Sequence, residues 1–169
     1  MQQDFVQQAQ PPSTTPADFD FIIGQWQVHH RRLRHRLQDC QEWVSFSGRS
    51  EFRKLMNGQG NVDDNWLDLP GDPYHAATLR AFDPKTQQWA IWWLDGRYPA
   101  NIDAPMRGSF ANGIGLFLAD DTFEGRPIRV RFIWTTSTPQ GSRWEQAFSV
   151  DGGESWETNW VMDFERVGA

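Results

Sequence analysis

The fold is decided by the stretch WEQAFSVDGGESWETNWVM, residues 144–162. Large apolar side chains alternate there with smaller or polar ones, on either side of the turn Asp151-Gly152-Gly153. A period of two is typical of strands with one buried face, and glycine supplies the positive φ that hairpin turns need. If Val150 pairs with Trp156, all the large groups share one face, whereas a shift by one residue would mix the faces. We therefore predict a hairpin with the pairs Phe148–Thr158, Gln146–Trp160 and Trp144–Met162 on its apolar face, and Ala147–Asn159 and Glu145–Val161 on the other.

The same patterning extends outward through most of the chain. Short runs rich in aromatic and β-branched residues are separated by clusters of Gly, Pro, Asn and Asp, and helical periodicity is confined to a short turn near residues 17–22. An open meander would leave two unpaired edges, which closure into a barrel removes. We predict an all-β, antiparallel, up-and-down barrel of about ten strands, at residues 24–37, 42–56, 60–68, 75–82, 89–95, 105–110, 114–119, 127–136, 143–150 and 156–166.

Length and composition limit the organisation of the chain. With 169 residues, 38% of them hydrophobic, the chain can bury one sizeable core but not two comfortable ones. Residues 1–17 are rich in Gln, Pro, Ser and Thr, and such a composition does not bury enough apolar surface to order itself. The sequence therefore predicts a flexible tail over 1–17 and a single barrel domain over 18–169.

Charge and cysteine content exclude several classes of partner. A net charge of −6 argues against nucleic acid, which requires a basic surface. No apolar run approaches the roughly 20 residues that span a bilayer, and the N-terminus lacks a secretory signal pattern. The lone Cys40 cannot form an internal disulfide. We expect no membrane span and a cytoplasmic location, although a signal removed before residue 1 would leave no trace.

A signature at the start of the predicted barrel suggests its relatives. Gly24-Gln25-Trp26 opens the first strand, and Arg166 stands near the end of the last. This pairing resembles the lipocalin-like, or calycin, barrels, and in particular uncharacterised bacterial lipocalin-like proteins. The resemblance implies that Trp26 plugs the closed end and that Arg166 packs across its indole, both as structural residues. A haem-binding branch of these relatives uses a late histidine, but the last histidine here is His75, so we expect no cofactor.

A second motif lies within the last hairpin. Ser149-Val150-Asp151-Gly152-Gly153-Glu154-Ser155-Trp156 resembles the Asp-box hairpin of sialidases and other β-proteins. The resemblance implies that Asp151 caps the backbone amides of the loop and that Trp156 is buried beside the strand. In propellers the box repeats, whereas it occurs once here, so we interpret it as a stable turn without glycosidase chemistry.

The run from His29 to Arg36 is the main concentration of positive charge. Alternation places His30, Arg32, Arg34 and Arg36 on the face of Trp26, unless a bulge intervenes. If that face points inward, His30 and Arg32 could bind a carboxylate or phosphate, as intracellular lipid-binding relatives bind fatty acids. Because four cations inside one barrel are costly, a solvated extension of the strand explains the same residues. Both interpretations stay open.

Ten tryptophans and twelve phenylalanines suggest an interior that large flat groups fill or line. Our main hypothesis is a barrel that binds a small apolar or amphipathic molecule, anionic molecules included. One alternative is a small barrel enzyme acting on a lipid-like or aromatic substrate, with Asp95, His30 and His75 as acid or base and Arg32 as anion stabiliser. Another alternative is a plugged barrel that forms a homodimer. We assign no catalytic residue and no metal site. The predicted ligand-binding residues are His30, Arg32, Trp93, Trp144, Gln146 and Trp160, and the structural ones are Gly24, Trp26, Asp151, Trp156 and Arg166.

Overall fold

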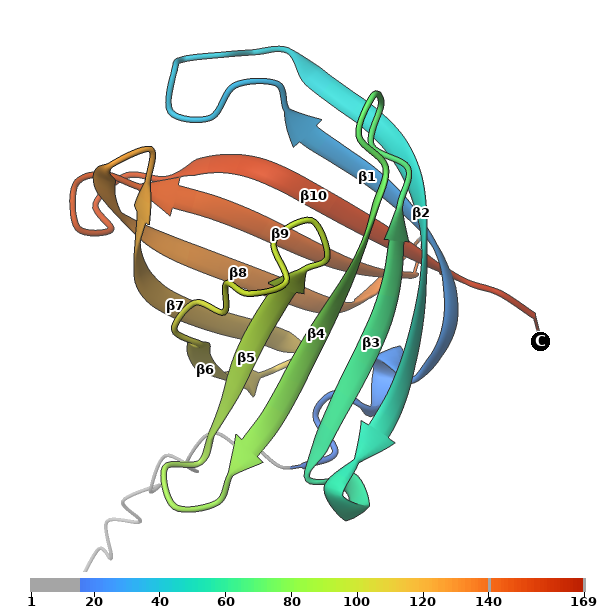
Figure 1. Ribbon diagram of the computed structural model, residues 1–169. Helices are drawn as coiled ribbons and strands as arrows, with labels where there is room; N and C mark the ends of the chain where they lie inside the picture. The colour runs from blue at the N-terminus through green and yellow to red at the C-terminus, as the bar shows by residue number, and fades with distance from the viewer. Residues whose placement is uncertain (1–15, 140, 169) are drawn as a thin grey trace, which may run out of the picture.

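The computed structural model describes residues 16–139 and 141–168, and these form a closed antiparallel barrel of ten strands (Figure 1). Each strand pairs with its neighbours in sequence, and β1 pairs with β10 to close the ring. The predicted all-β, up-and-down fold class is therefore confirmed. Residues 1–15 of the expected tail lie outside the described residues. The strands are β1 (Gly24–Leu33), β2 (Trp43–Leu55), β3 (Gly60–Leu67), β4 (Tyr74–Asp83), β5 (Gln88–Asp95), β6 (Met106–Ala111), β7 (Ile114–Phe123), β8 (Arg126–Thr138), β9 (Gly141–Ser149) and β10 (Glu157–Arg166).

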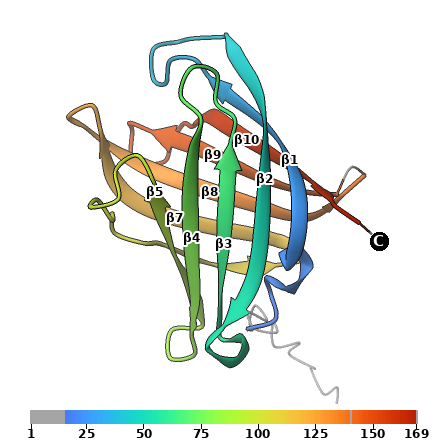
Figure 2. The same ribbon diagram turned by 45° about the vertical axis from the view of Figure 1, so that its right-hand side comes forward.

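Two short 3₁₀ helices complete the fold, η1 (Asp20–Ile22) before β1 and η2 (Met56–Gly58) between β2 and β3. Figures 1 and 2 show η1 at the same end of the barrel as the β2–β3 and β4–β5 turns. The longer loops, β1–β2 and β3–β4, lie at the opposite end. We call the end with η1 the closed end and the other the open end.

The closed end is sealed by the segment that carries η1. The Trp26 indole donates a hydrogen bond to the Ile22 carbonyl over 2.6 Å, and the Arg166 guanidinium lies 4.2 Å from the indole centroid. Arg166 also donates to the carbonyls of Ile23, at 3.0 Å, and Phe21, at 3.1 Å. Gly24 has φ of +126°, and a Cβ there would lie 2.7 Å from Arg166 Nη1. Glycine is thus required both by the backbone conformation and by the close guanidinium.

The first strand is shorter than predicted. β1 ends at Leu33 rather than at residue 37, and the chain then bends into a loop closed by a hydrogen bond from Arg34 N to Glu42 O. Positive φ at Leu37, 58°, turns the loop back over the open end, where Leu37 N donates to the Glu157 carboxylate. Alternation therefore stops at Leu33, and the prediction that Arg34 and Arg36 continue the strand face is wrong.

The last hairpin has the predicted register over most of its length. Gln146 pairs with Trp160 and Trp144 with Met162, as the apolar face requires. Near the turn, however, Phe148 pairs with Glu157 and Ala147 with Thr158, because a β-bulge lies between Thr158 and Trp160. The bulge inserts Asn159, which is fully buried, and corrects the predicted pairs Phe148–Thr158 and Ala147–Asn159.

The turn between β9 and β10 is held by its own side chains. The Asp151 carboxylate accepts from Ser155 N at 2.9 Å, and Ser149 Oγ accepts from Gly153 N at 2.8 Å. Hydrogen bonds from the hydroxyl and amide of Ser155 hold the pKa of Asp151 well below its ordinary value. Trp156 lies outside the barrel, half-buried, with the Arg131 guanidinium 4.4 Å from its ring centroid.

Candidate functional site: an aromatic cavity inside the barrel

The barrel encloses a cavity of about 600 Å³. It is lined by residues of β1 and of β3 to β10, together with Arg36 of the β1–β2 loop and the loop that follows β5. β5 and β6 pair only from Trp89–Gly108 to Ile91–Met106, so the outer end of β5 is flanked by that loop instead of a strand. Asp103 and Ala104 of the loop belong to the cavity wall.

One side of the cavity is a wall of aromatic rings centred on Trp160. Trp144 and Trp93 meet Trp160 edge to face, with centroids 5.3 Å and 6.0 Å away and interplanar angles of 88° in both cases. Phe132 packs against Trp144 at 4.8 Å. Edge-to-face pairs hold each other's orientation, so these rings form a rigid, flat-sided surface facing the cavity.

His30 supports this wall from β1. The Trp160 indole N–H donates to His30 Nδ1 over 3.2 Å, and the imidazole stacks on Phe46 at 4.6 Å. Burial, reinforced by the charges of Arg32 and His29, lowers the pKa of His30 to about 3, so its ring is neutral and Nδ1 is free to accept. A Cβ at Gly48 would lie 2.6 Å from His30 Nε2, so this glycine leaves the space that the ring occupies.

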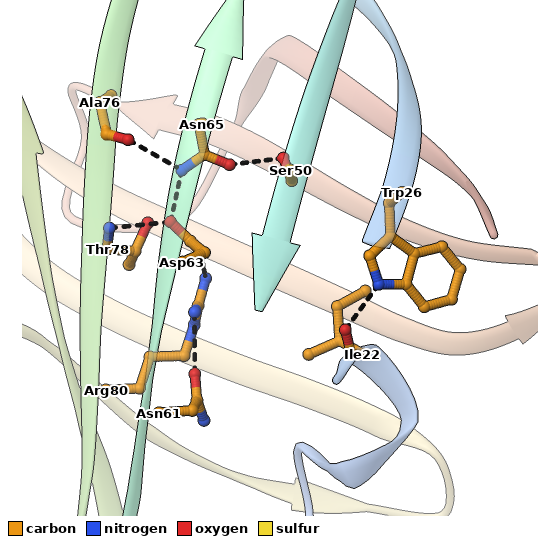
Figure 3. Close-up of polar contacts among 9 residues, drawn as sticks. All are labelled: Ile22, Trp26, Ser50, Asn61, Asp63, Asn65, Ala76, Thr78 and Arg80. Atoms are coloured by element: carbon orange, nitrogen blue, oxygen red, sulfur yellow. Dashed lines mark hydrogen bonds and ion pairs between the residues drawn. The ribbon is translucent and has the colours of Figure 1, made fainter. Parts of the chain in front are cut away.

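The opposite side of the barrel interior is polar (Figure 3). Asp63, on β3, forms an ion pair of 2.7 Å with Arg80, on β4, and both side chains are at least 95% buried. Asp63 also accepts from Thr78 N at 2.8 Å and from the Asn65 amide, while Arg80 donates to Asn61 at 3.0 Å. The Arg80 guanidinium lies between the rings of Phe19, Phe52 and Trp134, at 5.1–5.9 Å. The buried charges are thus compensated within the protein.

Two guanidinium groups at the open end lack an ion-pair partner in the described part of the chain; the carboxylates of Glu124 and Glu157 act on Arg36 only from a longer distance. Arg32 lies 5.1 Å from the Trp160 centroid, and Arg36 lies 4.7 Å from Phe123 and 5.7 Å from Phe148. Within residues 16–139 and 141–168, neither forms an ion pair. Burial and the nearby Arg32 lower the pKa of Arg36 to about 10, which leaves it charged at neutral pH. Both side chains line the cavity.

The rim of the open end carries a third guanidinium, which is already paired. Arg97 contacts Asp95 at 2.8 Å and also Asp72, and it lies 3.7 Å from the centroid of Tyr74. Although partial burial of Asp95 opposes the change, hydrogen bonds from Arg97 hold the pKa of this carboxyl below its ordinary value. Burial raises the pKa of Tyr74, whose hydroxyl is hydrogen-bonded to Arg32. This cluster fixes the edge of the opening.

All six residues that sequence patterning singled out for ligand binding line this one cavity: His30, Arg32, Trp93, Trp144, Gln146 and Trp160. Asp95 lines it too, but His75 points outward and packs on Trp66 at 4.8 Å, so the suggested trio of acid–base residues is not assembled. The described residues contain no group of three or more His, Cys, Asp or Glu able to hold a metal ion.

Sequence reasoning missed Arg36 as a cavity residue and missed the Asp63–Arg80 pair. Arg36 comes from a loop, where alternation has no meaning. The sequence did contain a pattern that indicates the pair. Asn61, Asp63 and Asn65 alternate on β3, and Arg80 interrupts the apolar face of β4.

Comparison with models of known protein families finds none that matches the chain, and a search of curated proteins finds no significant match. Within the described residues, no helix is long and apolar enough to cross a membrane. The fold and the site therefore define the class: a closed ten-stranded antiparallel barrel, compatible with the lipocalin-like fold, with an aromatic internal cavity.

Proposed function

We propose that this protein binds a small amphipathic, anionic molecule inside its barrel, with the apolar body against the aromatic wall and the acidic group at the open end. The observation that carries the proposal is the pairing of an aromatic cavity with two cations, Arg32 and Arg36, that have no carboxylate partner among the described residues.

The size and lining of the cavity support such a ligand. Small-molecule sites are typically about 300–1,000 Å³, mostly apolar, with a few polar groups that fix orientation. The cavity, at about 600 Å³, lies within that range. Its wall of Trp93, Trp144 and Trp160 offers flat apolar contacts to a ligand. A plugged barrel that serves only as a dimerisation module would leave no interior space of this size.

The charge of the ligand follows from the open end. Arg32 and Arg36 are half-buried, and partial removal of a guanidinium from water without an ion-pair partner costs free energy, of which a contact with an aromatic face recovers only about 1–2 kcal/mol. A carboxylate or phosphate between Arg32 and Arg36 would supply the missing charge and accept charge-assisted hydrogen bonds. The planar guanidinium suits both anions.

Two matched probes test the proposal, 2-naphthoate and the uncharged 2-naphthylmethanol, titrated by calorimetry. We expect wild-type protein to bind 2-naphthoate at least tenfold more tightly than the alcohol. Arg36→Gln should remove most of that preference, because it removes one cation and leaves the aromatic wall in place. A tenfold preference corresponds to about 1.4 kcal/mol.

Arg34→Gln is the control, because Arg34 lies in the same loop but is exposed and pairs with Glu42 at 2.8 Å. It should bind both probes as the wild type does. Failure of both probes to bind the wild type, or equal losses in the Arg34 and Arg36 variants, would contradict the proposed function.

A further inference from the structure

Gln146 is a polar side chain in the middle of the aromatic wall. It lies on β9 between the inward residues Trp144 and Phe148, pairs across the strands with Trp160 and Phe132, and is 92% buried, at 8% exposure. It also lines the cavity. A polar group in such surroundings needs hydrogen-bond partners for all of its polar atoms.

The protein supplies a partner for one end of the Gln146 amide. Its Nε2 donates to Asn159 Oδ1 over 2.9 Å, while the second polar atom of the amide has no partner among the described residues. The fully buried unpaired atom of this pair is Nδ2 of Asn159, whereas Gln146 lines the cavity, so its oxygen can reach a partner inside it. An acceptor that faces an apolar space without a partner forgoes a hydrogen bond, and a leucine at position 146 would avoid that loss. The free end of the amide is therefore explained most simply by a partner that enters the cavity.

The β-bulge holds Gln146 in place. The shift in register between Thr158 and Trp160 inserts Asn159, which is fully buried next to β9. Without the bulge, Asn159 would face Ala147 on the outer side of the hairpin and could not reach Gln146. Because Asn159 is itself fully buried, the hydrogen bond to it orients the Gln146 amide, as a recognition group requires.

We infer that Gln146 recognises an uncharged hydrogen-bond donor, such as a hydroxyl, on the body of the ligand, because its free amide oxygen is an acceptor. This inference rests on the proposed function and narrows its ligand class to aromatic acids that carry a second polar group. The acid lies near Arg36, whose guanidinium is 5.7 Å from the Phe148 centroid. Gln146 is two residues deeper on β9, which is roughly 7 Å along a strand. The two polar groups of the ligand are separated by a similar distance.

The probes 6-hydroxy-2-naphthoate and 2-naphthoate differ by one hydroxyl on the far side of the ring system from the acid. Calorimetric titration of wild-type protein should give a dissociation constant roughly five- to twentyfold lower for the hydroxylated probe. In Gln146→Leu the two probes should bind equally, with 2-naphthoate bound at least as tightly as by the wild type. Gln146→Met, which keeps an unbranched side chain, should behave in the same way and serves if the leucine variant does not fold.

Glu145→Leu is the matched control, because it makes the same kind of change at the adjacent residue on the outer face of β9 and should leave the ratio unchanged. Equal binding of the two probes by the wild type, or a ratio that survives both substitutions of Gln146, would overturn this inference while leaving the proposed function intact. Failure of the wild type to bind either probe would overturn both.

Discussion

His30 shows how one buried side chain can make the whole barrel sensitive to acid. Its ring accepts a hydrogen bond from Trp160 and stacks on Phe46, so protonation would remove the acceptor and place a cation beside Arg32. Its pKa of about 3 in the folded protein lies below the ordinary 6.5, so the unfolded chain takes up this proton first as the pH falls. The stability that depends on neutral His30 is complete above pH 6.5 and is lost between 6.5 and 3.

We therefore expect the free energy of unfolding to fall by up to about 1.4 kcal/mol per pH unit below pH 6.5 because of this one group. Urea denaturation at pH 7, 6 and 5 measures the slope. His30→Gln should have a shallower slope, whereas His29→Gln, which changes the exposed neighbour on the outer face, should keep the wild-type slope. Identical slopes in all three proteins would show that His30 titrates normally.

At the scale of elements, β3 and β4 are joined inside the barrel by the Asp63–Arg80 pair. Removing one member of a buried ion pair leaves the other charge buried alone, which typically costs about 3–5 kcal/mol. We expect Arg80→Leu to lower the free energy of unfolding by this amount, as measured by chemical denaturation.

A second substitution, Asp63→Asn, should recover part of the loss in the Arg80→Leu background, because it removes the isolated charge. The exposed pair Arg34–Glu42, at 2.8 Å, provides the comparison, and Arg34→Gln should change stability by less than about 1 kcal/mol. If Arg80→Leu lowers the free energy of unfolding no more than Arg34→Gln does, the Asp63 carboxylate must be solvated by water inside the barrel.

Alternation predicted ten strands and their order because most strands have one apolar inner face; β3, whose inner face carries Asn61, Asp63 and Asn65, is the exception. Alternation could not predict the ends of strands whose backbone pairing continues or stops independently of side-chain polarity. β7 runs to Phe123 rather than to residue 119, because backbone pairing with β8 continues through the polar residues Asp120, Asp121 and Thr122. The bulge at Asn159 has no signature in a pattern that counts only apolar and polar positions.

The candidate site likewise contains residues that alternation could predict and residues that it could not. Inward residues of strands, such as Trp93 and Gln146, could be selected from alternation alone. Arg36 could not, because its position depends on the loop that Glu157 fastens through Leu37 N. The contact between Gln146 and Asn159 depends on the bulge and likewise could not be predicted from the sequence.

For the molecule as a whole, stability depends on sealing the closed end. Arg166 lies over Trp26 and donates to two carbonyls of the segment that carries η1. A cation–π contact at an exposed site contributes about 0.5–1 kcal/mol, and each net hydrogen bond contributes about 1 kcal/mol. We expect Arg166→Leu to lower the free energy of unfolding by about 2 kcal/mol and to speed amide hydrogen exchange at Ile22 and Ile23.

Arg166→Lys keeps the charge but not the forked donor geometry, so it should recover only part of the stability. The exchange rates separate a local effect from a general one. Equal acceleration of exchange in η1 and in residues 121–123 of β7, which lie at the open end, would mean that Arg166 acts on the barrel as a whole rather than on its closed end.

The pairing of β1 with β10 also affects how the protein can be made in the cell. The hydrogen bond from Arg166 to Ile23 joins residues 143 positions apart, so both partners exist only once the ribosome has translated nearly the entire described chain. Until then the nascent sheet exposes the free edge of β1, and contacts between such distant residues form slowly. The barrel can therefore close only after β10 has been synthesised, and the interval before closure is when the growing chain is most vulnerable to aggregation.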